Sequence, residues 1–157
     1  MAIELDRVDI QILNILQEDA STPLRKLAEQ VHASAATCQR RIAQLRASGV
    51  LVKDVALVDR VRVGRPLTAF VTVQLEQQNT ALLKMFEALM REQPDVMACY
   101  EVAGEFDFML VVTAQSMEAF QAFTRRVFTS NNNIANYKSL LAMNCAKFDT
   151  RVPLQFE

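Results

Sequence analysis

The sequence has little of what metal centres, disulfide frameworks and membrane spans require. Its single histidine, His32, cannot by itself supply a multi-histidine metal site and is expected in a solvated turn. The three cysteines are odd in number and lack metal-like spacing, which favours reduced thiols. No apolar run reaches the roughly 18 residues that span a bilayer, and the first residues lack a signal-peptide pattern. With 51% hydrophobic residues, the chain is expected to fold as a soluble protein.

Positive charge is concentrated in one segment, although the net charge is only −1. Residues 20–66 carry nine basic and three acidic side chains, whereas residues 1–19 carry one basic and five acidic. Residues 67–157 carry seven basic and ten acidic. A phosphate-binding surface needs such a local excess of Lys and Arg. A solvated basic face would have the same composition, so charge alone leaves both interpretations open.

The first third of the chain predicts three short helices. Residues 5–19 form an amphipathic segment with Asp6 as its N-cap. A second helix is expected to start with Thr22 as its cap and a proline in its first position. Ser34 caps the third helix, and Gly49, which tolerates a left-handed backbone, ends it. A helix, a tight turn and a longer capped helix are typical of a helix-turn-helix unit, which places the start of its second helix in the DNA major groove.

The third helix has two distinct faces. Cys38, Ile42 and Leu45 are spaced i, i+4, i+7 and form a narrow apolar face. The opposite face is small, polar and basic, and consists of Ala36, Gln39, Arg40, Ala43 and Ala47. Arg40 is therefore predicted to contact a phosphate or a guanine. Arg41 lies at the edge of the apolar face, where it either contacts DNA or pairs with an acidic residue of the first helix.

The candidate DNA-binding residues lie on this helix or in the basic segment around it. Three small or polar positions near its start are candidate base readers, and two outlying cations are either phosphate contacts or plain surface charges. The full set is Ser34, Ala36, Thr37, Gln39, Arg40, Arg41, Arg25 and Lys53.

The remaining chain alternates between strands and helices. Strands are expected at 67–76, 95–103, 108–113 and within 134–148, and helices at 80–92 and 116–128. The order βαββαβ is the ferredoxin-like arrangement. The predicted fold class is thus α+β, with a (winged) helix-turn-helix domain over 1–50, a β-strand linker or hinge over 51–66, and a βαββαβ domain over 67–157. Helices on one face leave the other face of the sheet to be covered, so an apolar run such as 108–112 predicts at least a dimer.

Several segments carry a family resemblance through their order and spacing. They are residues 5–13, Leu27-Ala28, Ser34, Arg41-Ile42, Leu45, Gly49-Val50, the Gly104–Asp107 turn and Val152-Pro153-Leu154. Together they resemble the Lrp/AsnC family of transcription regulators over essentially the whole chain. The resemblance implies a cytoplasmic, sequence-specific regulator that binds double-stranded DNA and assembles as dimers and often as tetramers of dimers, that is, octamers. No cofactor, metal or membrane partner is expected.

The resemblance also implies a small effector, usually an amino acid, bound at or near the contact between dimers. Carried over by position, the effector-binding residues are Val102, Ala103, Gly104, Glu105, Asp107 and Ser139. Free amide donors beside a carboxylate suit an amino acid, although Gly104 and Asp107 are also ordinary turn formers. Tyr137 stands where the family more often has a small hydroxyl residue, so we expect it to crowd or reshape the pocket.

Two other functions fit parts of the chain. Siroheme decarboxylases resemble the same two-domain arrangement, but they rely on basic residues including histidines in the second domain. This chain has no histidine after His32, so no enzyme activity is expected. A metabolite sensor or adaptor that no longer binds DNA is the other alternative, and the Gln39-Arg40-Arg41 face argues against it. The sequence therefore predicts a DNA-binding regulator that responds to a small effector.

Overall fold

The computed structural model describes residues 4–130 and 133–155, and it divides the chain into two units. The helical unit contains the residues up to Leu57 together with those from Lys147 onward, and the α/β unit runs from Val58 to Ala146. The predicted α+β class is confirmed. Within the described ranges, no helix is long and apolar enough to cross a membrane.

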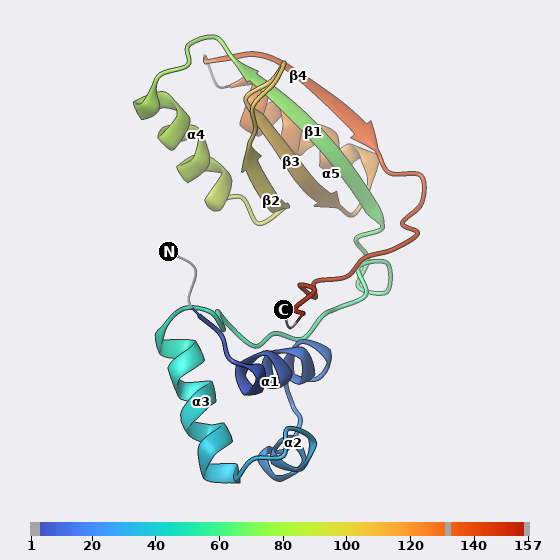
Figure 1. The fold of residues 1–157 in the computed structure, drawn as a ribbon. Helices are drawn as coiled ribbons and strands as arrows, with labels where there is room; N and C mark the ends of the chain where they lie inside the picture. Colours follow the sequence, from blue (N-terminus) through green and yellow to red (C-terminus); the bar gives the residue numbers. More distant parts are fainter. Residues whose placement is uncertain (1–3, 131–132, 156–157) are drawn as a thin grey trace. The chain divides into compact units, whose positions relative to one another are not determined.

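The helical unit contains α1 (Arg7–Glu18), α2 (Leu24–Gln30) and α3 (Ala35–Ala47) (Figure 1). The Asp6 carboxylate accepts hydrogen bonds from the first turn of α1, and Asp9 completes a reciprocal capping box. The prediction for α2 was wrong in detail. Pro23 is the N-cap of α2, and no side-chain hydrogen bond caps this helix. The hydroxyl of Thr22, the predicted cap, donates instead to the carbonyl of Asp19 at 2.8 Å.

The turn between α2 and α3 contains no glycine, and His32 takes over the conformational role that glycine often has there. Its φ of +53° lies in the left-handed region, which His visits more often than most residues. This conformation lets the Ala33 N–H donate to the carbonyl of Ala28 at 3.1 Å, which closes the end of α2. Gly49 ends α3 with φ +77°, as predicted from the sequence.

The core of the helical unit is small and joins all three helices. Its fully buried side chains include Ile12 of α1, Leu27 of α2 and Cys38 of α3. Burial raises the pKa of the Cys38 thiol, with desolvation as the main cause. Leu154, close to the C-terminus, packs against the same cluster, so the core of this unit is not built from the N-terminal residues alone.

The C-terminal tail is held on α1 by polar contacts, and this differs from the predicted domain limits. The Gln17 amide donates to the carbonyl of Val152 at 3.1 Å and accepts its N–H at 2.6 Å. Arg151 pairs with Glu18 at 3.0 Å. Residues from Lys147 onward thus belong to the helical unit and not to the 67–157 domain expected from the sequence, because they find their partners on α1.

The linker forms no strand within the described residues, contrary to the strand or short wing predicted from its β-branched residues. Val52 is 81% exposed. A strand needs a neighbour for its backbone N–H and C=O groups, and a single chain supplies none here. The following segment is a turn in which the Asp59 carboxylate accepts the N–H of Val61 at 3.0 Å.

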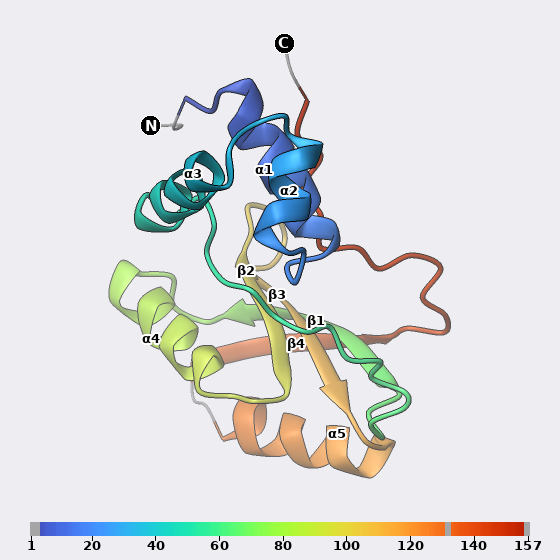
Figure 2. The ribbon, with the colours of Figure 1, turned by 90° about the horizontal axis from the view of Figure 1, so that it is seen from below.

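The α/β unit is a four-stranded antiparallel sheet in the order β2-β3-β1-β4, with two helices on one face (Figures 1 and 2). Its elements are β1 (Leu67–Leu75), α4 (Thr80–Arg91), β2 (Val96–Glu101), β3 (Phe108–Ala114), α5 (Met117–Thr124) and β4 (Ile134–Leu141). A π-helical turn, Arg125–Thr129, continues α5. The order βαββαβ is that predicted from the sequence.

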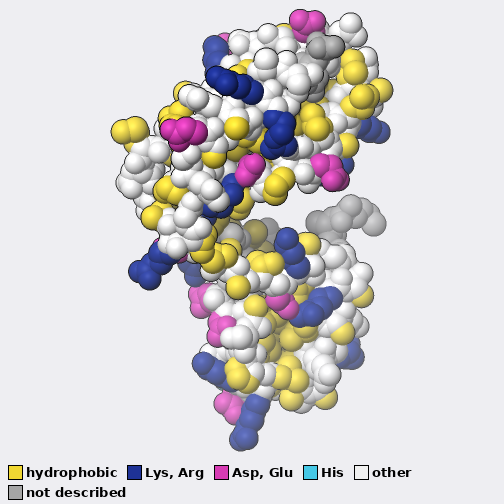
Figure 3. Space-filling model, turned by 180° about the vertical axis from the view of Figure 1, so that it is seen from behind, with side chains coloured by type: hydrophobic (Ala, Val, Ile, Leu, Met, Phe, Trp, Pro, Cys, Tyr) yellow, Lys and Arg dark blue, Asp and Glu magenta, His cyan; other side chains and the backbone are white. Residues whose placement is uncertain are grey.

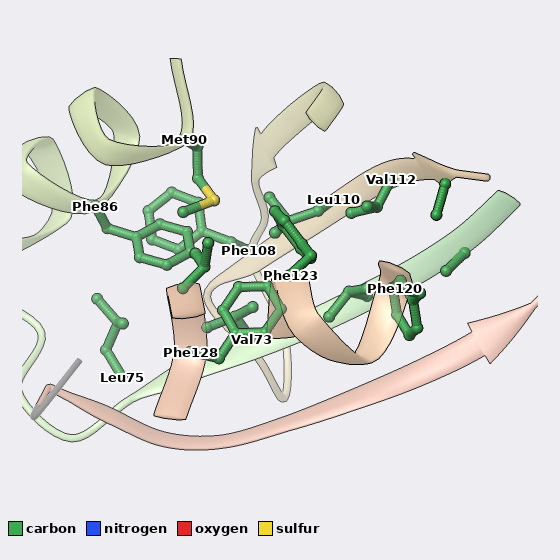
Figure 4. Close-up of a cluster of buried hydrophobic side chains, with 14 residues drawn as sticks. Val73, Leu75, Phe86, Met90, Phe108, Leu110, Val112, Phe120, Phe123 and Phe128 are labelled. Atoms are coloured by element: carbon green, nitrogen blue, oxygen red, sulfur yellow. The ribbon is translucent and has the colours of Figure 1, made fainter. Parts of the chain in front are cut away.

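Alternation along β1 divides the sheet into a buried and an open face. Val71 and Val73 point into the helix layer and are fully buried. Aromatic side chains dominate that layer: the rings of Phe86 and Phe108 lie 4.5 Å apart, and Figure 4 shows them beside Met90 of α4. On the open face Phe70 is 40% exposed. The core therefore lies entirely on the helix side, and an apolar face remains uncovered in a single chain.

Candidate DNA-binding helix and effector loop

The start of α3 is organised by its own cap. The Ser34 hydroxyl accepts the Thr37 N–H at 3.1 Å and lies 2.8 Å from the Thr37 hydroxyl. The hydroxyls of two predicted DNA-binding residues are therefore engaged with each other, while the Ser34 side chain stays exposed at the helix start. This cap fixes the direction in which the first turn of α3 presents its side chains.

The outward face of α3 lies where its spacing predicted. Cys38 and Leu45 are buried, and the exposed positions on the other side are Ala36, Gln39, Arg40, Ala43 and Ala47. Sequence reasoning missed Gln44, which is exposed and accepts a hydrogen bond from Arg40 at 3.4 Å. The i, i+4 spacing of Arg40 and Gln44 was the available signal. This contact holds the Arg40 guanidinium against the outer side of the helix.

Arg41 is committed to helix α1 in this structure. Its Nη1 donates to both carboxylate oxygens of Asp9 at 3.1 Å and also to Asp6. The pKa of Arg41 is raised, chiefly by the hydrogen bond to Asp6. The pKa of Asp6 is lowered, first by the backbone N–H of Asp9 and also by Arg41. Of the two roles left open for Arg41, the structure contains the ion pair, which fastens α3 to the start of α1.

The basic segment is partly neutralised by ion pairs. Arg25 pairs with Glu29 at 3.4 Å, and Arg46 pairs with Asp54 at 2.5 Å. In the described part of the chain, Arg40 and Lys53 make no ion pair. Lys and Arg side chains are spread over the helical unit in the view of Figure 3, with acidic side chains among them. The cations with no carboxylate partner are therefore the better candidates for phosphate contacts.

The loop between β2 and β3 is fastened to β1 through Asp107. The Asp107 N–H donates to the carbonyl of Val73 at 2.9 Å, and its carboxylate accepts the N–H of Leu75 at 2.7 Å. The pairing of β1 with β4 shifts register between Gln74 and Leu75, so Asp107 bonds to a backbone group at an irregularity of the sheet. Asp107 is thus a structural anchor of the loop, in addition to any contact with a ligand.

Gly104 has neither of the usual structural reasons for being glycine. Its φ is not positive, and a Cβ placed on it would meet no atom within 4 Å. The structure therefore does not support the alternative in which Gly104 serves only as a turn former with a left-handed backbone. Ala103, Gly104 and Glu105 are exposed, so the loop presents its backbone to whatever approaches from outside the chain.

One predicted residue of the effector site lies on another strand of the same chain. Ser139 of β4 pairs with Val71, and β1 separates it from the loop strands. The Tyr137 ring packs into the helix-side core, with its centroid 4.9 Å from that of Phe128, and its effect on the effector pocket stays a prediction. One chain therefore brings together residues 102–107 but leaves Ser139 apart from them.

Both halves of the chain match domains of known protein families. Residues 5–46 match the AsnC-type helix-turn-helix domain, and residues 68–152 match the Lrp/AsnC ligand binding domain. An uncharacterised HTH-type transcriptional regulator of Haemophilus influenzae is 45% identical over 150 residues, which is 96% of this chain and 89% of the relative. The DNA-binding transcriptional activator DecR of Escherichia coli is 30% identical over 151 residues, covering 96% of this chain and 99% of DecR.

Solved structures agree with these matches. An AsnC family transcriptional regulator from Agrobacterium tumefaciens superposes with a TM-score of 0.89 at 34% identity, covering 95% of this chain and 97% of that one. A transcriptional regulator from Neisseria meningitidis, solved as a complex with L-Met, gives a TM-score of 0.89 at 31% identity, covering 96% and 97%. The similarity spans both units and the linker between them.

Proposed function

Since the chain belongs to the Lrp/AsnC family of transcriptional regulators, we propose that α3 reads its DNA and that the 102–107 loop carries its response to a small effector. The observation that carries the DNA role is the outward face of α3, which is exposed, contains Arg40 without an ion-pair partner among the described residues, and is fastened to α1 through Arg41. In a helix-turn-helix unit this face enters the major groove.

The effector proposed for the loop is an α-amino acid. Its carboxylate needs backbone N–H donors and its ammonium needs an anion, and the exposed loop offers peptide groups beside Glu105 and Asp107. The unoccupied space beside Gly104 supports close approach of a ligand or of a second copy. The related Neisseria regulator was solved with L-Met, which favours the same chemical class here.

A homodimer is proposed as the smallest working form. The open face of the sheet exposes Phe70, Tyr100 and Leu140 at 40%, 60% and 62%, which is an apolar surface that a second sheet would cover. The unpaired linker offers a further edge for the same contact. Two recognition helices fixed in one dimer would read half-sites about 34 Å apart, or a multiple of that spacing.

Effector control would then act through assembly. Ser139 lies on the opposite side of β1 from the loop strands of its own chain. The proposed pocket combines Ser139 and the loop from neighbouring copies, and an octamer built from four dimers would supply such contacts. A coupling free energy of about 1–3 kcal/mol between effector and DNA is enough to change occupancy roughly 5–150-fold.

The DNA role is tested by mobility shift on the DNA upstream of the protein's own gene, with and without a panel of amino acids. We expect Arg40→Ala to weaken binding by about 1–3 kcal/mol if it reads a base, or to weaken all sequences alike if it contacts a phosphate. Arg125→Ala, which removes an exposed arginine of the α/β unit, is the charge-matched control. Equal binding by both variants would contradict the assignment of α3.

The dimer is tested by sedimentation at micromolar concentration. Phe70→Lys should dissociate the wild-type assembly, because it places a charge in the apolar contact, while Gln121→Lys on an exposed position of α5 should leave it intact. A wild-type protein that sediments as a monomer would refute the proposal. For the loop, Asp107→Ala should abolish effector-dependent changes in assembly.

A further inference from the structure

Arg65 connects the ends of three neighbouring strands of the sheet. It lies two residues before β1, and its Nη2 donates to the carbonyl of Thr113, near the end of β3, at 2.7 Å. The same guanidinium pairs with Asp95, the residue directly before β2. Thr113 is 2% exposed, and its N–H donates to the carbonyl of Asp95 at 2.9 Å. We call Arg65, Asp95 and Thr113 the Arg65 joint, and all three belong to the α/β unit.

The Arg65 joint also fixes the end of the linker. The Arg65 N–H donates to the carbonyl of Arg60 at 2.7 Å, which closes the preceding turn. Arg60 in turn donates to the Thr68 hydroxyl of β1 at 3.0 Å. Pro66 stiffens the backbone between the joint and β1, because proline fixes its own φ and restricts the residue before it. The direction in which the linker leaves the sheet is therefore set at Arg65.

The hairpin of β2 and β3 connects this joint with the 102–107 loop. Its strands pair from Val96, next to Asp95, as far as Glu101, with one shift of register after Val96. The loop closes the other end of the hairpin, where the Val102 N–H donates to the carbonyl of Asp107 at 2.9 Å. Figure 1 shows the loop and the linker turn at opposite ends of the sheet. A hydrogen-bonded hairpin moves largely as one body, so the position of its loop affects the position of its other end.

Asp95 has a second basic neighbour, which gives the joint two possible arrangements. Arg126, in the π-helical turn, lies 3.7 Å from the Asp95 carboxylate and donates to the amide oxygen of Gln93 at 2.7 Å. The side chains of Arg65 and Arg126 are 31% and 57% exposed. If Arg65 left, its guanidinium would be hydrated and Asp95 would keep a cation beside it, so the exchange costs little. The contact can therefore change without unfolding the sheet, as a switching element requires.

We propose that the Arg65 joint passes the state of the 102–107 loop to the linker, and through the linker to α3. This inference rests on the function proposed above for the loop and for α3. Displacement of the loop would move Asp95 and Thr113 relative to Arg65. Asp95 would then keep Arg126, and the released Arg65 would free the end of the linker. Arg65 is thus a positioning residue for DNA binding, which it affects from outside the recognition helix.

Hydrogen exchange of the full-length protein, without DNA or any ligand, tests the connection. Arg65→Gln should speed exchange of the loop amides at least about twofold, although the substitution lies at the other end of the hairpin. Asp95→Asn should change the loop in the same direction. Arg62→Gln, which removes an exposed ion pair with Asp59 in the same turn, is the charge-matched control and should leave the loop unchanged. Unchanged exchange at Val71, in the middle of β1, shows that the sheet stays folded.

DNA affinity tests the transmission. Asp107→Ala removes a contact that anchors the loop to β1, and it should change the dissociation constant for DNA about fivefold or more when Arg65 is present. Combined with Arg65→Gln, the same substitution should change it less than about twofold, because the loop is then disconnected from the linker. Combined with Arg62→Gln, its full effect should remain, which separates the joint from a simple loss of positive charge. Arg65→Lys, which keeps a cation beside Asp95, should recover part of the effect.

Two results would overturn the proposal. The first is loop exchange that changes in neither Arg65→Gln nor Asp95→Asn. The second is an effect of Asp107→Ala on DNA affinity that has the same size with and without Arg65→Gln, including no effect in either case. A wild-type protein that binds no DNA would instead refute the function proposed for α3, and hydrogen exchange would still decide whether the joint connects the loop with the linker.

Discussion

The helical unit and the α/β unit are stabilised in different ways. Among the described residues, the α/β unit buries fourteen hydrophobic side chains in one cluster, and its aromatic rings pack directly on one another. In the same ranges the core of the helical unit has seven buried side chains, and polar contacts add to it: a capping box, the Arg41 ion pairs and a tail docked on α1. A small core leaves less hydrophobic stabilisation, so individual polar contacts carry more of the stability of the unit that reads DNA.

The largest expected effect is in the aromatic core. Phe108 is fully buried between the sheet and α4, and Phe108→Ala should destabilise the α/β unit by about 3–5 kcal/mol. Urea unfolding monitored by residue-specific NMR should show this unit unfolding earlier. Met85→Ala, at a side chain that is 66% exposed on the same helix as Phe86, should change stability by less than about 0.5 kcal/mol.

The next largest effect concerns the ion pairs of Arg41 with Asp9 and Asp6, which we call the Arg41 clamp. Asp9→Ala removes an acceptor of the partly buried Arg41 guanidinium and also the carboxylate that completes the α1 capping box, and we expect the helical unit to lose about 1–3 kcal/mol. DNA affinity should fall in parallel, because α3 is less firmly positioned. Glu29→Ala removes an exposed ion pair of the same unit and should cost at most about 0.5 kcal/mol. Equal effects of both variants would show that the clamp has no special weight.

The positive φ of His32 allows the free-energy cost of a left-handed backbone at this turn to be measured. His32→Val places a β-branched residue at positive φ and should destabilise the helical unit by about 1–2 kcal/mol. His32→Gly should lie within about 0.5 kcal/mol of wild type, because the relief of strain is offset by greater freedom in the unfolded chain. Thermal unfolding of the two variants measures the difference. A His32→Val protein as stable as His32→Gly would contradict the assigned conformation.

A smaller effect is expected where the tail docks. Gln17→Ala removes both hydrogen bonds to Val152 and should cost about 1 kcal/mol, with faster hydrogen exchange confined to the tail and α1. Gln121→Ala, at an exposed position of α5, is the control in the other unit. Faster exchange in the α/β unit instead would mean that the tail belongs there.

The smallest effect is the acid response of the tail. The hydrogen bond from Arg151 is the main reason that the pKa of Asp149 falls from 3.8 to about 2. Because the folded pKa lies below the unfolded one, this ion pair stabilises the tail above about pH 4 and is lost as the pH falls towards 2. Carboxyl NMR titration of Asp149 should follow this. Arg151→Ala should raise the midpoint towards 3.8, and Arg125→Ala should not.

Several features of both units could be predicted from sequence because they depend on neighbours a few residues apart. The caps Asp6 and Ser34, the Cys38-to-Leu45 spacing and the strand alternation that buries Val71 and Val73 are all local patterns. The linker is the instructive failure. Its β-branched residues have a high strand propensity, but no neighbouring strand pairs with the linker within one chain, so no strand forms there.

The candidate sites show the same difference between local patterns and contacts between distant segments. The helical period alone placed Ala36, Gln39 and Arg40 on one exposed face. Spacing could place Arg41 only at the edge of that face, because its acceptors lie 32 and 35 residues away. Likewise nothing local indicated that Tyr137 packs on Phe128.

The sequence by itself thus determined the helices, the strands and the face of α3 that is free to meet DNA. Only the tertiary structure decided that Arg41 holds that helix in place, that the C-terminal tail completes the helical core, and that Met97 forms a β-bulge at the edge of the sheet. The physical reason is the separation along the sequence over which each kind of interaction acts. Periodicity and capping act within one turn or one strand, whereas ion pairs, docked tails and bulged edges depend on segments brought together by folding.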